Sequence, residues 1–247
     1  MRAFPWFCRA VLVAACALWA VHPAAPATPP RVAIVFEHAG ASVAQLAPIY
    51  AMHEPFGLGI FPHERYSARI VRDAAAHGLT PLLHLPLEAR HPADVGPVSG
   101  VVEVRMSDAQ IARVVDDDLA STPGVVGVSS HAGSLATADR RVMAVVLRTI
   151  KAHGLWFQEN RTTADSVASD VARGLGVRTV LVTTYLDDPP VDIERKVRAL
   201  IETARRQGAV VAGAHITTGA PEVVARLLPE FRRAGIVFVP VTEFLTP

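Results

Sequence analysis

Acidic and imidazole side chains follow several short apolar segments of the chain, in positions typical of catalytic or metal sites. The first such segment, 32–36, is followed directly by Glu37 and His38. His84 and His131 follow two later segments. Imidazole nitrogens and a carboxylate oxygen form the usual three-ligand set of a catalytic zinc ion, with a fourth position left for water. These residue types indicate metal chemistry if the fold brings them together.

Other polar residues follow apolar segments in the same way and are further candidates for this site. They are Glu88, Glu159, Arg161, Asp187 and His215. Some of the candidates also have a structural alternative. Glu37 and Glu159 could form salt bridges at a rim, while His84 and His131 could be buried histidines that hydrogen-bond to the backbone.

The remaining histidines of the mature chain have simpler explanations. His77 and His153 precede glycines at predicted helix ends, where a cation interacts favourably with the helix dipole. His53, His63 and His91 fall in predicted loops or at helix edges, and we expect them to be solvated.

The candidate residues are positioned by a repeating alternation of strand and helix. Short apolar segments, rich in β-branched residues, predict strands. They cover 32–36, 56–61, 80–83, 125–130, 155–158, 178–182, 209–213 and 236–239. Amphipathic segments between them predict helices at 42–52, 64–77, 107–120, 137–153, 163–173, 191–207 and 221–234. Such alternation implies parallel pairing through right-handed crossovers.

The ends of these elements support the assignment. Glycines at 78, 154, 208 and 235 separate helical patterns from strands, as helix C-caps do. Ser107 with Gln110 and Thr163 with Ser166 are predicted helix starts. Eight parallel strands point to an α/β fold of the barrel or near-barrel type. Reactive groups then gather at the carboxyl ends of the strands.

The first 27 residues have the composition of an export signal. Arg2 and Arg9 precede an apolar segment at 10–21, and small residues suited to cleavage follow at 23–27. The apolar segment is short for a membrane span, which needs about 20 residues. A retained anchor and a lipoprotein cleavage at Cys16 are the alternatives. We expect a secreted or periplasmic protein with one domain over residues 28–247.

The charge balance and the positions of the cysteines limit the kinds of partner and of cross-link that the mature protein can have. Without Arg2 and Arg9, 22 basic side chains stand against 23 acidic ones, so the formal charge changes from +1 to −1. This balance gives no indication of a nucleic-acid partner. Both cysteines, Cys8 and Cys16, lie in the predicted signal. The mature chain therefore forms no disulfide and depends on its core for stability.

Several ordered motifs resemble the divergent polysaccharide deacetylase family of bacterial secreted proteins. The segment 84–88 reads His-Leu-Pro-Leu-Glu, which is similar to the family's His-Leu-Pro-Met-Glu. The segment 129–134 and the Thr-Ala-Asp at 137–139 resemble its Asn-Asn-His-Met-Gly-Ser block and the Thr-Ala-Asp after it. Similar matches occur at 32–40, 158–163 and 186–187, so the resemblance covers about 31–241.

The resemblance implies a distorted (β/α) barrel and metal-dependent hydrolysis of N- or O-acetyl groups on a glycan. It implies that Glu37 acts as the base, and that His38, His84 and His131 hold a divalent metal, with zinc as the expected ion. Glu88 could instead complete this set or orient a ligand.

The resemblance also implies groups for the later steps of the reaction. Glu159, Asp187 or His215 would protonate the leaving group. The backbone near Gly40 or Arg161 would stabilise the oxyanion.

The chain departs from the family pattern where the chemistry is expected. The family's Asp-Asp pair is Glu37-His38 here, and its Asp-Ser pair is Glu159-Asn160. Its late Gly-His-Pro is Gly-Ala-His-Ile at 213–216. A periplasmic glycan-binding or scaffold protein that keeps the barrel without the reaction is therefore the alternative. A metal-free hydrolase with Ser134 beside His131 is a weaker one, because the serine lacks a Gly-x-Ser-x-Gly context.

Overall fold

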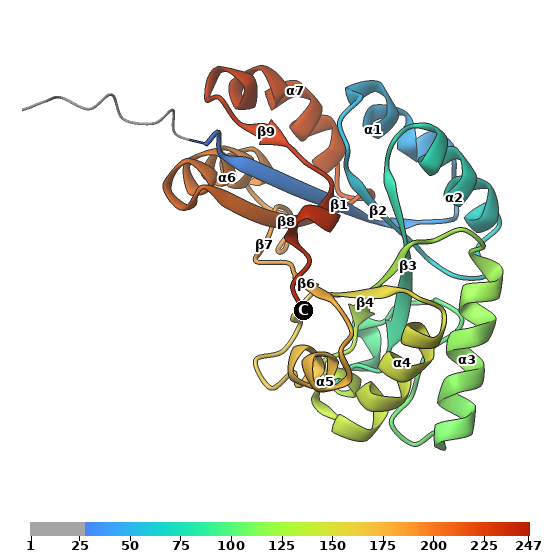
Figure 1. Ribbon diagram of the computed structural model, residues 1–247. Coiled ribbons are helices and arrows are strands. Elements are labelled where there is room, and N and C mark those ends of the chain that lie inside the picture. The colour runs from blue at the N-terminus through green and yellow to red at the C-terminus, as the bar shows by residue number, and fades with distance from the viewer. Residues whose placement is uncertain (1–27) are drawn as a thin grey trace, which may run out of the picture.

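One curved sheet of parallel strands, covered by helices on its outer face, forms the protein in the computed structural model, which describes residues 28–247 (Figure 1). The predicted export segment, 1–27, lies outside the described residues. The strands follow the order β6-β5-β4-β3-β2-β1-β8-β7, and β9 also pairs with β1. Among the described strands, β6 and β7 do not pair with each other. The fold is thus the predicted distorted (β/α) barrel, left open on one side.

Most predicted elements are present, with shifted ends. The strands are β1 Arg31–Ala39, β2 Gly57–Ile60, β3 Thr80–Leu87, β4 Gly127–Ala132, β5 Trp156–Glu159, β6 Thr179–Leu181, β7 Thr184–Tyr185, β8 Ala209–His215 and β9 Val237–Phe238. The helices are α1 Ala47–Met52, α2 Ser67–Ala76, α3 Asp108–Ser121, α4 Arg140–Ala152, α5 Ala168–Leu175, α6 Ile193–Gln207 and α7 Ala220–Arg233. Strand β7 has only two residues, and its segment was not predicted.

Five strands run further than their apolar segments indicate, which corrects the predicted position of the site residues. Glu37 and His38 lie within β1 rather than after it. In the same way, β3, β4, β5 and β8 include His84, His131, Glu159 and His215. The reason is pairing with neighbours: Glu37 is in register with His215 of β8, and His84 with Ser129 of β4. Ladder hydrogen bonds extend a strand through polar residues that an apolar pattern would exclude.

The predicted helix starts are confirmed in one case and wrong in another. Ser107 and Gln110 form a reciprocal capping box at the start of α3. Helix α5, predicted from residue 163, begins only at Ala168. The preceding chain is held elsewhere, because Thr162 donates its hydroxyl hydrogen to the carbonyl oxygen of Ala132 at 2.6 Å.

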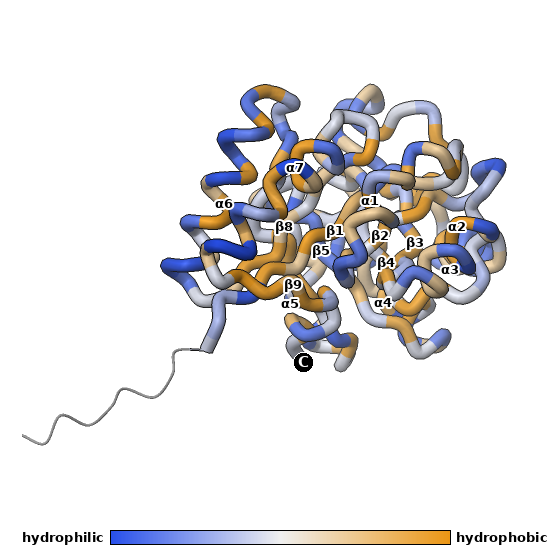
Figure 2. Tube along the Cα trace, turned by 90° about the horizontal axis from the view of Figure 1, so that it is seen from above, coloured by the Kyte–Doolittle hydropathy of each residue, from blue (hydrophilic) through white to orange (hydrophobic). Residues whose placement is uncertain are grey.

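The core has two outer layers and one inner cluster. Helices α1, α2, α6 and α7 pack on β1, β2 and β8, whereas α3, α4 and α5 pack on β3, β4 and β5. Hydrophobic strands lie inside and hydrophilic residues gather on outer helix turns, notably those of α6 (Figure 2). Inside the curve of the sheet, Val35, Trp156, Val180 and Val211 pack with Val241 of the C-terminal segment. This segment also bridges to β6 through Thr246 and Thr179.

No helix within residues 28–247 combines the length and the apolar character needed to cross a membrane.

A buried carboxylate on α3 joins this helix to the loop after β2. Oδ1 of Asp118 lies 2.8 Å from Nε2 of His63, while its buried Oδ2 has no hydrogen-bond partner within residues 28–247. The backbone of Gly100 covers the carboxylate so closely that a Cβ atom there would lie 2.1 Å from Oδ1. Burial, helped by the neighbouring charge of Asp117, raises the pKa of Asp118 to about 8. His63 is exposed, as predicted, and its Nε2 also pairs with this group.

We expect Asp118→Asn to change how stability depends on pH. Between pH values near 4 and 8 the unfolded chain has released the Asp118 proton while the folded protein retains it, so rising pH favours unfolding of the wild type. The variant lacks this group and should gain a few kcal/mol on the wild type over this range, since each pKa unit is worth about 1.4 kcal/mol. Urea unfolding at pH 5 and pH 9 measures the difference.

An exposed acid on another helix provides the control. Glu202→Gln removes a surface carboxylate of α6 that pairs with Arg205, and it should change stability by no more than about 0.5 kcal/mol at either pH. Identical pH dependence in the wild type and in Asp118→Asn would contradict the predicted ionisation.

Candidate active site

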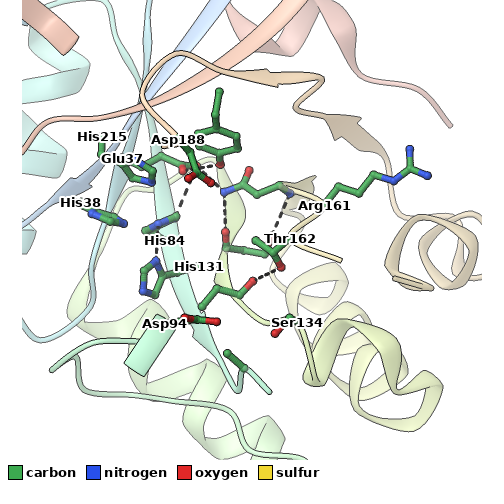
Figure 3. Close-up of a pocket in the computed structure, with 15 residues that line it drawn as sticks. Glu37, His38, His84, Asp94, His131, Ser134, Arg161, Thr162, Asp188 and His215 are labelled. Carbon is green, nitrogen blue, oxygen red and sulfur yellow. Dashed lines mark hydrogen bonds and ion pairs between the residues drawn. The ribbon is translucent and has the colours of Figure 1, made fainter. Parts of the chain in front are cut away.

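A pocket of about 620 Å³ opens at the carboxyl ends of the strands. Its walls come from β1, β3, β4, β7 and β8 and from the loops that follow β3, β4 and β5 (Figure 3). Glu37, His38, His84, His131 and His215 all line it. The barrel thus brings the histidines predicted at separate strand ends into one cavity.

Glu37 and His38 both face the pocket although they are neighbours in one strand, where side chains normally alternate between faces. The explanation is a bulge in β1. Phe36 is in register with Leu58 and Ala39 with Ile60, so two residues of β1 stand opposite the single residue Gly59. His38 adopts a left-handed backbone conformation, with φ of 72°. Bulges of this kind occur next to active sites, where they redirect a side chain.

Three histidines of the pocket lie close enough together to bind one metal ion. Ligand atoms of His38, His84 and His131 all lie within 4.8 Å of one another. Burial, together with the imidazoles of His215 and His131, lowers the pKa of His38 to about 3. Burial also lowers the pKa of His84 well below its ordinary value, and lowers that of His131. All three rings are therefore neutral near pH 7, which is the form that binds metal.

The hydrogen bonds of these rings leave nitrogen lone pairs directed at a common point. Nε2 of His131 lies 2.9 Å from the carbonyl oxygen of Val95. A carbonyl oxygen can only accept a hydrogen bond, so Nε2 carries the proton of this ring. Nδ1 of His131 then has a lone pair and lies 3.2 Å from Nε2 of His84. Nδ1 of His84 lies 2.8 Å from the hydroxyl of Ser129, which can accept a hydrogen bond from the Nδ1–H group. With His84 protonated on Nδ1, the lone pairs of His84 Nε2 and His131 Nδ1 face each other, and a cation between them would stabilise this arrangement.

The third ring provides an independent observation. Nε2 of His38 is buried and has no hydrogen-bond partner among the described residues. A buried polar atom without a partner is unusual and costs free energy. A divalent cation would satisfy this nitrogen together with those of His84 and His131. The donor set of three neutral imidazoles suits zinc, with a coordination position left open.

Glu37 is a buried acid held by three donors. Its Oε1 accepts hydrogen bonds from Nε2 of Gln158 at 3.1 Å and Nδ2 of Asn160 at 2.7 Å. Its Oε2 accepts one from the hydroxyl of Tyr185 at 2.9 Å. Burial raises the pKa of Glu37 to about 7, although the charge of His215 and the bonds from Asn160 and Tyr185 favour the ionised form. Glu37 therefore exchanges a proton readily near neutral pH.

The glutamate fits at this position because the neighbouring strand has a glycine. A Cβ atom on Gly59 would lie 3.2 Å from Cγ of Glu37 and 3.4 Å from Cγ of His84. The contact with Glu37 would be tighter than ordinary van der Waals packing, and the contact with His84 would be at its lower limit. Gly59 thus provides the space for the longer acid and for the imidazole beside it.

An ion pair between Asp187 and His215 lies on the other side of His38. Nδ1 of His215 is 3.1 Å from Oδ1 of Asp187, and the backbone N–H of His215 donates to Oδ2 at 2.6 Å. Burial alone would raise the pKa of Asp187, but hydrogen bonds from His215 and Thr218 lower it overall. The pKa of His215 is raised, because Asp187 outweighs the effect of burial. The His215 ring lies 4.3 Å from that of His38, centroid to centroid.

Comparison with known proteins identifies the family of the chain. The family profile described as "Divergent polysaccharide deacetylase" matches residues 34–245. The chain belongs to this family. An uncharacterized protein of Haemophilus influenzae is 30% identical over 193 residues, which cover 75% of this chain and 66% of that protein. The chain therefore spans slightly less than two thirds of this relative.

Solved structures show the same fold at low identity. The crystal structure of an uncharacterized protein from Agrobacterium tumefaciens C58 has a TM-score of 0.77 at 23% identity, covering 90% of this chain and 91% of that one. The catalytic domain of a peptidoglycan N-acetylglucosamine deacetylase from Eubacterium rectale has a TM-score of 0.53 at 12% identity, covering 90% and 92%. Both identities are below 25%, so these likenesses concern the fold alone.

Three of the predicted site residues lie apart from the histidine cluster. Glu159 lies on the other side of β5 from Gln158, and its carboxylate accepts hydrogen bonds from the backbone N–H and the hydroxyl of Ser169 in α5. The carboxylate of Glu88 accepts the backbone N–H of Val104 at 2.6 Å. Neither acid lines the pocket.

The third is Arg161, which lines the pocket but whose guanidinium extends away from the histidines (Figure 3). Ser134 also lines the pocket, and its hydroxyl accepts the backbone N–H of Arg90 at 3.0 Å. It makes no hydrogen bond with His131, because the two nitrogens of that ring face Val95 and His84. The arrangement gives no support to a serine nucleophile.

Sequence reasoning missed four residues of the site. Gln158, Asn160 and Tyr185 bind Glu37, and Phe61 contacts the histidine rings. The spacing of Gln158 and Asn160 was the available signal, because residues two apart in a strand share a face. No local pattern connects Tyr185 or Phe61 to the site, since strands that are distant in sequence place them there.

We expect the purified protein to bind one equivalent of Zn²⁺ at the three histidines. His84→Ala or His131→Ala removes one of three ligands and should weaken binding at least tenfold, because the loss of even outer-shell partners typically costs 10–100-fold. Isothermal titration calorimetry measures the affinity. His153→Ala, at the exposed end of α4, should leave it unchanged. Undiminished affinity in both cluster variants would exclude this metal site.

Proposed function

We propose that this protein is a metal-dependent deacetylase that hydrolyses N- or O-acetyl groups of a glycan. One observation supports this above all: Glu37, an acid with a pKa near 7, shares a pocket with three neutral histidines whose ligand atoms lie within 4.8 Å of one another. A base and a metal set in one cavity are the parts that hydrolysis of an acetyl group requires.

Each side chain has a distinct part in this proposal. His38, His84 and His131 would hold a divalent metal, which would supply Lewis-acid chemistry towards water and the acetyl carbonyl. Glu37 takes the proton from the attacking water. Oε2 is the receiving atom, because it accepts one hydrogen bond, from Tyr185, whereas Oε1 accepts two. Burial and the carboxylate of Glu37 raise the pKa of Tyr185 well above its ordinary value, so its phenol remains a donor.

His215 is the group suited to protonate the leaving amine or alcohol. Asp187 raises its pKa and fixes its Nδ1, which leaves the Nε2–H free to donate. Asp187 thus acts through His215, while Glu159 and Glu88, as placed, serve the surrounding structure. The proposed acid, His215, lies on β8, and the proposed base, Glu37, lies opposite it on the neighbouring strand β1.

We also propose that the protein acts outside the cytoplasm, after removal of residues 1–27. The composition of this segment supports export. An acetylated cell-wall or other extracellular glycan is the corresponding substrate.

A glycan-binding protein without catalysis is the second candidate. The observation in its favour is that three donors already occupy Glu37, so that the acid is held firmly in place. Release of acetate from acetylated chito-oligomers or peptidoglycan fragments, with and without added Zn²⁺, distinguishes the two. Binding of these glycans without acetate release would favour the second candidate.

Glu37→Gln should lower acetate release at least 100-fold, because the amide keeps the shape and cannot accept the proton, and general base catalysis contributes about 10²–10⁴-fold. Acetate is measured by a coupled enzymatic assay at saturating Zn²⁺. Glu222→Gln, an exposed glutamate in the first turn of α7, is the matched control and should retain full activity. Equal activity of Glu37→Gln and the control would exclude Glu37 as the base.

The pH profile should be bell-shaped. Activity rises as Glu37 ionises, with a midpoint no higher than about 7, since a bound cation favours the carboxylate. It falls at higher pH as His215 loses its proton, above the ordinary histidine value because Asp187 raises its pKa. His215→Gln should abolish the alkaline limb and lower the plateau. An unchanged alkaline limb in this variant would assign that ionisation to another group.

A further inference from the structure

Phe61 lies against all three histidines of the proposed metal set. It directly follows β2, and its ring is 5.0 Å from that of His38, centroid to centroid, with the planes only 25° apart. Its centroid lies 5.1 Å from that of His84 and 4.7 Å from that of His131, the latter in a T-shaped arrangement. A single side chain thus forms one wall of the whole cluster.

The three rings are oriented by different means. His84 is fixed by the hydroxyl of Ser129, and His131 by the carbonyl of Val95. Metal-binding histidines usually depend on such a second hydrogen bond for their orientation. For His38 the described residues provide no hydrogen bond to either ring nitrogen, neither to Nδ1 nor to the buried Nε2, and its ring packs between Phe61 and the ring of His215.

Phe61 is itself anchored to the bulge that turns His38 into the pocket. Its backbone N–H donates to the carbonyl of Ala39 at 2.8 Å, one residue beyond His38. Its carbonyl accepts the buried hydroxyl of Ser67 at 2.7 Å, at the start of α2. These two hydrogen bonds therefore fix the position of Phe61 relative to the backbone of His38.

We propose that Phe61 is the positioning residue of the metal centre: stacking on its ring holds the His38 imidazole where Nε2 meets the nitrogens of His84 and His131. The inference rests on the metal-dependent function proposed above. Stacking replaces, for His38, the hydrogen bonds that orient the other two rings. A residue without a ring at this position leaves His38 free to rotate about its side-chain bonds, and the three-nitrogen set is lost.

The test compares Zn²⁺ affinity and the visible spectrum of the Co²⁺-substituted protein in matched variants. Phe61→Leu should weaken Zn²⁺ binding by about 10–100-fold, the usual cost of losing an outer-shell partner, and should change the Co²⁺ absorption bands. Phe61→Tyr keeps the ring and should restore both to wild-type values within about threefold.

Phe56→Leu is the control for a purely structural effect. It removes a phenylalanine from the other end of the same strand, where the ring packs on Phe36 and Phe238 and on no histidine. It should lower the stability of the fold and leave Zn²⁺ affinity and the Co²⁺ spectrum unchanged.

Three outcomes would overturn the inference. Wild-type affinity and spectrum in Phe61→Leu would overturn it while leaving the proposed function intact. An equal loss of affinity in Phe56→Leu and Phe61→Leu would assign the effect to general destabilisation. Failure of the wild type to bind Zn²⁺ would overturn both the inference and the metal-dependent function.

Discussion

The β1 bulge opposite Gly59 is the constraint on which the site depends. Without it, Glu37 and His38 would point to opposite faces of the sheet, and the pocket would hold one of them. With two residues of β1 opposite one of β2, and with His38 in a left-handed conformation, both side chains enter the same cavity. A left-handed non-glycine residue is strained, so the surrounding packing must stabilise it. Phe61, bonded to Ala39 just beyond the bulge, is part of that packing.

Burial then separates the ionisation states of groups only a few ångströms apart. Desolvation keeps the three histidines neutral and holds the Glu37 proton up to about pH 7. Asp187 acts in the opposite direction on His215 and favours its cation. Three neutral imidazoles, an acid that ionises near neutral pH and an imidazole whose pKa is raised thus coexist in one pocket. Paired groups whose environments drive their pKa values apart are characteristic of acid–base catalysis.

The same network shows how the chain accommodates its departures from the family pattern. A glutamate replaces the first aspartate of the usual pair, and Gly59, Gln158, Asn160 and Tyr185 provide its space and its donors. A histidine replaces the second aspartate, and an aromatic wall supports it. Each substitution is therefore matched by its surroundings, as the proposed function requires.

The sequence by itself determined the α/β class, the parallel order of strand and helix, most element positions and the histidines 38, 84, 131 and 215 as candidates. It could do so because apolar periodicity and turn residues are local signals. Only the tertiary structure decided which way each side chain points. Glu159 turns to α5 and Glu88 to Val104, while Asn160 and Tyr185 reach Glu37. These choices depend on strand register and on a one-residue bulge, and both arise from pairing between segments that are distant in the chain.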